Sequence, residues 1–119
     1  MSILLSDASL KTYKQLLPAS LSIMRKAEEH FKNNGTNLND LAEMRLIEDM
    51  APLTFQVFSI VHHSVGAIEA LRTGEFSPPK MPDDLSFNDL IDLLEDAKEN
   101  LNHTSNEEID SFSGREVMF

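Results

Sequence analysis

Two adjacent histidines, His62 and His63, lie in the apolar stretch EDMAPLTFQVFSIVHHSVGAIEAL and are the first residues that could do chemistry. An imidazole can bind a transition metal or transfer a proton near neutral pH. Neighbouring positions on a helix point about 100° apart, so the two rings cannot enter one small coordination sphere. A chelating pair on a helix needs a spacing of three or four residues, and the residues at those distances are valine, glycine and alanine. The pair alone therefore does not predict a metal site.

The remaining candidate ligands are too far from His62. Glu69 is on the same helical face, but seven residues correspond to about 10.5 Å along the axis. In an up-down-up bundle, His30 and His103 would lie at the same end, roughly 15 Å from His62. We therefore expect no metal and no cofactor, and His62 is the single candidate metal ligand.

Other catalytic patterns are absent from the sequence. There is no cysteine, the four glycines are isolated, and no nucleophile elbow occurs. Carboxylate pairs such as Asp83–Asp84 and Glu107–Glu108 fall on loops or polar faces, where water solvates both groups. The residues thus predict a bundle that binds or interacts, and leave open whether it is an enzyme.

The elements that must position these side chains are helices. Apolar residues between Asp7 and Asn33 recur at steps of three and four, which predicts one long amphipathic helix. Asp7 or Ser6 can cap its start, and Gly35 suits a left-handed turn after its end. Pro18 removes one backbone hydrogen bond and should kink this helix near its middle.

A second long helix is predicted from Pro52, which suits a first turn, to about Arg72. It is apolar around most of its circumference, because Phe55 and Phe58 lie beside its main apolar stripe. Such a helix should be covered by other elements on most sides, and we expect Phe58 to lie in the core. Arg45 and the residue four positions on, Asp49, should form an ion pair where this helix starts.

The third long helix, over residues 86–102, should begin with a capping box of Ser86 and Asp89. A short helix from Asn39, a Pro-rich extended crossover before Ser86 and a weak turn over residues 107–112 complete the pattern. We therefore predict an all-α, antiparallel up-down bundle with three long helices, in a single domain over residues 1–119. The third helix should bury Phe87, Leu90, Ile91, Leu94, Ala97 and Leu101.

Charge and composition exclude several partners. The net charge is −10, and the segment from Asp83 to Asp110 contains ten acidic residues and a single lysine. No basic stripe exists that could displace counterions from nucleic acid, and an acidic membrane surface would repel the chain. Without a signal peptide or a membrane-spanning stretch, a cytosolic location is expected.

The segments SDAS, KAEEH, RLIEDMAPLTFQV and SFNDL occur in an order that resembles one branch of the DinB-like superfamily, a domain of unknown function. The most specific string holds Arg45, Asp49, Pro52 and Gln56. The resemblance implies a four-helix bundle that is often dimeric. Some relatives are metal-dependent thiol transferases or isomerases, whose metal is held by one histidine of the second helix and two of the last.

In this sequence only His62 or His63 matches the second-helix ligand of those relatives, and the position of His62 one turn after Phe58 favours His62. The last helix, with its histidine, is absent, which predicts a truncated chain or a bundle that another molecule completes. The resemblance therefore implies the fold more strongly than the chemistry.

Two hypotheses of function follow. The first is a non-catalytic bundle that binds a small apolar ligand or another subunit, with Phe55, Phe58, His62 and Glu69 as pocket candidates. The alternative is a degenerate DinB-like metal-dependent transferase or isomerase of small-molecule metabolism. Because two neighbours cannot cover so apolar a second helix, we expect a two-fold dimer through the first two long helices. His62 should then lie near the seam, with His63 toward solvent.

Overall fold

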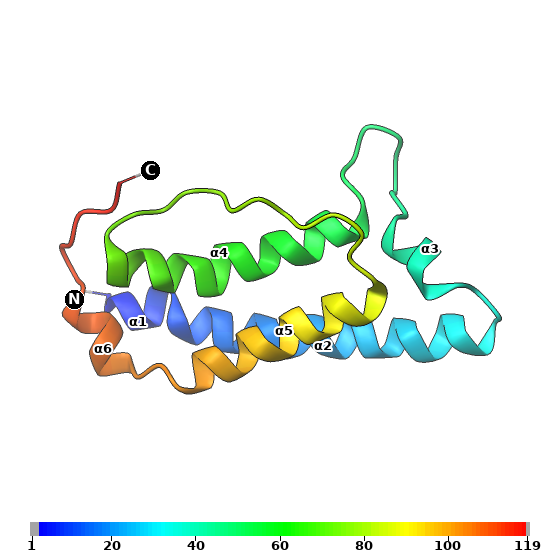
Figure 1. The fold of residues 1–119 in the computed structure, drawn as a ribbon. Helices are drawn as coiled ribbons and strands as arrows, with labels where there is room; N and C mark the ends of the chain where they lie inside the picture. Colours follow the sequence, from blue (N-terminus) through cyan, green and yellow to red (C-terminus); the bar gives the residue numbers. More distant parts are fainter. Residues whose placement is uncertain (1–2, 119) are drawn as a thin grey trace.

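Three long helices form the body of the protein in this computed structural model, which describes residues 3–118 (Figure 1). No strand occurs among these residues, and the one extended pairing is an isolated bridge between Glu75 and Met118. The predicted all-α bundle with three long helices is confirmed. None of the described helices is long and apolar enough to cross a membrane. The helices are α1 (Leu5–Ala8), α2 (Leu10–Asn33), α3 (Leu38–Ala42), α4 (Leu53–Thr73), α5 (Phe87–Asn102) and α6 (Asn106–Ser111).

α5 is the helix around which the core is built. It packs against both α2 and α4, while α2 and α4 contact each other far less. Its first turn has the predicted capping box, in which Ser86 Oγ accepts from the N–H of Asp89 and Asp89 Oδ2 accepts from the N–H of Ser86. All six residues predicted to form its apolar face are buried: Phe87, Leu90, Ile91, Leu94, Ala97 and Leu101.

The direction of α5 differs from the expected up-down-up order. α4 and α5 run parallel, and both are antiparallel to α2 (Figure 1). The N–H of Phe87 at the start of α5 donates to Asn39 in α3, whereas Arg72 near the end of α4 donates to Thr104 just beyond α5. Residues 74–86 contain no helix, and thirteen residues of extended backbone can reach about 40 Å. This reach exceeds the roughly 31 Å length of α4, so the connection can return along that helix.

The N-terminal helix also begins differently from the prediction. The sequence predicts one helix capped by Asp7 or Ser6. Instead, α1 starts at Leu5 without a side-chain cap, and Ser9 interrupts the helical conformation before α2 begins. Ser6 is buried, and its N–H and hydroxyl donate to the carboxylate of Asp110 in α6, at 2.9 and 3.1 Å. A long-range contact therefore replaces the local cap.

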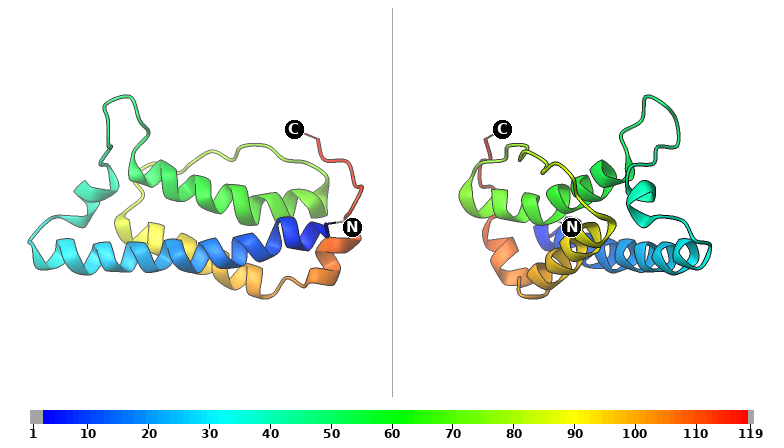
Figure 2. Two further views of the ribbon diagram at one scale, coloured as in Figure 1. Left: turned by 180° about the vertical axis from the view of Figure 1, so that it is seen from behind. Right: turned by 45° about the vertical axis from the view of Figure 1, so that its right-hand side comes forward.

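The rest of α2 follows the sequence pattern. The helix is continuous through Pro18 and ends before Gly35, whose φ of 74° is the predicted left-handed turn. Beyond α3, residues 43–52 form an irregular loop that projects from one end of the bundle in both views of Figure 2. Phe58 is half-buried rather than a core residue, because it faces residues 74–86 instead of α5.

Leu94 provides the sharpest test of this core. It is fully buried on α5, so Leu94→Ala should lower the free energy of unfolding by about 2–5 kcal/mol through lost burial and the cavity left behind. Leu46→Ala is the matched control, because Leu46 is 87% exposed and should change stability by less than about 0.5 kcal/mol. Urea denaturation measures both, and equal effects would contradict the assigned helix faces.

Candidate ligand-binding site

The extended segment of residues 74–86, here called the strap, covers the side of α4 that points away from the core (Figure 1). Pro78, Pro79 and Pro82 keep it out of a helix, because proline has no N–H and fixes φ. Gly74 starts the strap with a φ of 84°, which favours glycine. The C-terminal tail anchors this start: Met118 donates its N–H to Gly74 at 2.8 Å and accepts from Phe76 at 2.6 Å.

A pocket of about 420 Å³ lies between the strap and α4. The volume is within the range of small-molecule sites. No lysine, arginine, aspartate or glutamate lines it, and most of its walls are aromatic or proline rings. Three of the four pocket candidates from the sequence, Phe55, Phe58 and His62, line it from α4. The other lining residues are Ser59, His63, Phe76, Pro78, Pro79 and Met81.

The two histidines have different environments. His62 is half-buried, and its ring stacks on Phe76 with a centroid distance of 4.6 Å and an interplanar angle of 17°. His63 is exposed, as expected, and its Nδ1 lies 2.8 Å from the carbonyl oxygen of Ser59, one turn earlier in α4. We expected His62 to lie near a dimer interface. This prediction is wrong for the face of α4 that carries the His62 ring, because the chain's own strap covers that face.

Gly66 makes room for this arrangement. A methyl group at this position would come within 2.9 Å of His62 Nδ1, closer than a side chain tolerates. The mid-helix glycine costs about 0.5–1 kcal/mol relative to alanine. The absence of a side chain at Gly66 leaves room for the His62 ring between the helix backbone and Phe76.

Glu69, the fourth candidate, does not line the pocket. It is exposed and pairs with Arg72 at 3.2 Å. Arg72 also binds Glu108 at 2.7 Å and Thr104 at 3.1 Å, and these bonds tie the end of α4 to α6 and the segment before it. The hydrogen bond from Arg72 lowers the pKa of Glu108 below its ordinary value. This group therefore has a structural role.

The motif residues before α4 shape its N-terminus. The predicted Arg45–Asp49 ion pair does not form, because the two residues lie in the irregular loop rather than on a helix, and the Arg45 guanidinium donates to the carbonyl of Met50 at 3.0 Å. Pro52 is the residue immediately before α4, close to its predicted place. Gln56 donates its side-chain amide to the carbonyl of Ala51 at 3.3 Å and so closes the first turn.

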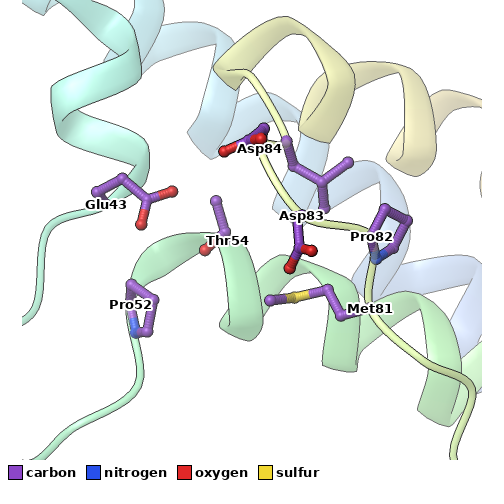
Figure 3. Close-up of a pocket in the computed structure, with 8 residues that line it drawn as sticks. Glu43, Pro52, Thr54, Met81, Pro82, Asp83 and Asp84 are labelled. Carbon is purple, nitrogen blue, oxygen red and sulfur yellow. The ribbon is translucent and has the colours of Figure 1, made fainter.

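A second, acidic pocket of about 520 Å³ lies at the other end of the strap. In Figure 3, the carboxylates of Glu43, Asp83 and Asp84 gather around Thr54, close to the start of α4. No side chain caps this helix end, so nearby negative charge stabilises its positive dipole. These carboxylates therefore have a structural explanation.

The described residues bring no metal site together. Within residues 3–118, no group of three histidine, cysteine or acidic side chains could hold an ion. His30 and His103 end α2 and α5, which are antiparallel, so they lie at opposite ends of the bundle rather than at one. His62 is therefore a pocket wall in this geometry, and its ring stacks on Phe76.

The strap residues of the pocket were not predicted. The sequence pattern predicts only an extended crossover for Phe76, Pro78, Pro79 and Met81. Phe76 carried a usable signal, because an aromatic residue in a Pro-rich connection needs an apolar surface to cover it. The least charged helix nearby, α4, was the surface available.

The environment of His62 predicts a pH dependence of stability. Burial lowers the pKa of His62 below its ordinary value of 6.5, and the proximity of His63 lowers it further. The unfolded chain therefore takes up this proton first as the pH falls. The free energy of unfolding should decrease as the pH falls below 6.5 toward the folded-state pKa.

Urea denaturation at about pH 7.5 and about pH 5.5 measures this loss. His62→Phe keeps a ring against Phe76 without a titrating group, so it should lose less stability between the two conditions. An equal loss in the parent and the variant would show that His62 is not desolvated when folded.

Comparison with known proteins adds a family but no activity. No curated protein and no solved structure is similar enough to the chain to count as a match. Residues 5–119, nearly the whole sequence, match one family, which is described as a domain of unknown function, DUF1993. The pocket, the strap and all three long helices lie within the matched range. The chain belongs to the DUF1993 family.

Proposed function

We propose that this protein is a non-catalytic binding bundle that holds a small apolar ligand between the strap and α4. One observation carries the proposal. Phe55, Phe58 and His62 meet Phe76 and Met81 around a single pocket of about 420 Å³. A pocket of this size with apolar walls and a few polar groups is typical of ligand sites.

The lining also supports a particular kind of ligand. Aromatic and proline rings offer flat apolar walls, which favour a flat ligand. No charged side chain lines the pocket, so neither an anion nor a cation would find a counter-charge there. The ligand is therefore uncharged.

The same features argue against metal catalysis as the primary activity. His62 stacks on a phenyl ring instead of facing other ligands. We further propose that the chain forms a single DinB-like domain, which the order of its sequence motifs and its three long helices support. Its activity as a binding module does not depend on that relationship.

A neutral fluorescent dye tests the pocket directly. N-phenyl-1-naphthylamine should bind, and Phe58→Ala should weaken its affinity about tenfold, because a wall of the pocket is lost. Ile23→Ala is the control, since Ile23 is 66% exposed on α2 and does not line the strap pocket. Circular dichroism establishes that both variants are folded. Weakening by Ile23→Ala alone would place the dye on α2 and overturn the proposal.

A second candidate role is self-association, supported by apolar residues on the flanks of α2 and α4 that face away from α5. On α2, Arg25 pairs with Glu95 of α5, and Leu16 and Ile23 lie on the opposite flank at 53% and 66% exposure. On α4, Ile60 is 37% exposed. With a net charge of −10, two copies can meet only where carboxylates are scarce, and these flanks carry none. We propose a two-fold dimer through them.

Sedimentation velocity at micromolar concentration tests the dimer. The parent chain should sediment as a dimer, and Ile23→Glu should shift it to monomer, because a carboxylate would be buried. Ser22→Glu adds the same charge to the neighbouring exposed position and should leave the dimer intact. A monomeric parent would refute the dimer and leave the pocket proposal unaffected.

A further inference from the structure

The polar atoms of the strap pocket restrict its ligand further, and this inference rests on the proposed ligand-binding function. The pocket has few polar groups: the two imidazoles and the Ser59 hydroxyl. In an apolar site, such groups decide orientation and specificity, because an unmatched polar atom is costly. The hydrogen bond of His63 determines what that side chain can offer.

The tautomer of His63 follows from its contact with the backbone. Its Nδ1 lies 2.8 Å from the carbonyl oxygen of Ser59, and a carbonyl oxygen only accepts hydrogen bonds. Nδ1 therefore carries the proton. In the neutral ring, Nε2 is then a bare acceptor, and it has no hydrogen-bond partner among residues 3–118.

His62 does not compete for this role. Its ring stacks on Phe76, and Gly66 leaves space for it against the helix. Burial favours its neutral form by lowering its pKa. No hydrogen bond fixes its tautomer within the described residues, so it is a flat wall rather than an oriented acceptor.

We propose that the strap pocket selects a neutral aromatic alcohol of the phenol or naphthol type, whose hydroxyl donates to Nε2 of His63. The aromatic rings of the ligand would lie against Phe58, Phe76 and the strap prolines. The hydroxyl would lie at the pocket mouth, where His63 is exposed. A ligand that only accepts hydrogen bonds, such as a ketone, would gain no bond to Nε2, and an anion would meet a chain of net charge −10.

A pair of near-isosteric ligands isolates the hydroxyl. 2-Naphthol and 2-methylnaphthalene differ by a hydroxyl in place of a methyl group, and the chain has no tryptophan to mask naphthalene fluorescence. At about pH 8, above the ordinary titration of histidine, 2-naphthol should bind about three- to tenfold more tightly. His63→Leu should abolish this preference while changing the affinity for 2-methylnaphthalene less than about twofold.

His62→Leu is the matched control. It should weaken both ligands alike and keep the preference for 2-naphthol. Equal affinities of the two ligands in the parent would overturn the proposal and leave an apolar site intact. A preference that survives in His63→Leu, or disappears in His62→Leu, would also overturn it. If neither ligand binds, the proposed function itself fails, and this inference fails with it.

Discussion

The burial of one face of α5 is the constraint on which the rest of this structure depends. Six of its side chains are withdrawn from water, and α2 and α4 pack against them from two sides. Because α4 and α5 run parallel, the chain must return along the length of α4 before α5 can begin. The strap is that return path. A connection imposed by topology thus becomes one wall of the candidate site.

The strap is held by contacts at both ends and in between. At its start, Gly74 and Phe76 bond to the backbone of Met118, and at its end Ser86 caps α5. Between these anchors, proline favours an extended backbone, and Phe76 stacks on His62. A pocket bounded by an anchored strap and a rigid helix is largely pre-formed, which lowers the entropic cost of binding.

Local patterns in the sequence predicted the elements, and tertiary contacts decided the rest. The three- and four-residue spacing in α5 identified every buried residue of that helix, and Ser86 with Asp89 identified its cap. The direction of α5 was mispredicted, because periodicity carries no information on the path of a connection. The predicted partners of Ser6 and Arg45 are wrong for a related reason, because each residue has a plausible partner nearby in the sequence. Ser6 instead donates to the carboxylate of Asp110, which is distant in the sequence. Arg45 lies in an irregular loop and donates to the carbonyl of Met50. Phe55, Phe58 and His62 were assigned to a pocket, whereas its opposite wall could be found only by folding the strap onto α4.

The central claim is that a neutral aromatic ligand lies between the strap and α4, and methionine methyl NMR tests it most directly. Met81 lines the strap pocket and also the acidic pocket, Met44 and Met50 line a separate pocket beside the loop of residues 43–52, and Met24 is buried in the core. Ring currents of a bound aromatic ligand shift the methyl groups that it contacts. On titration with 2-naphthol, the account predicts a saturable shift of the Met81 methyl signal, with Met24, Met44 and Met50 unchanged. Saturable shifts of Met44 and Met50 with a constant Met81 signal would contradict it.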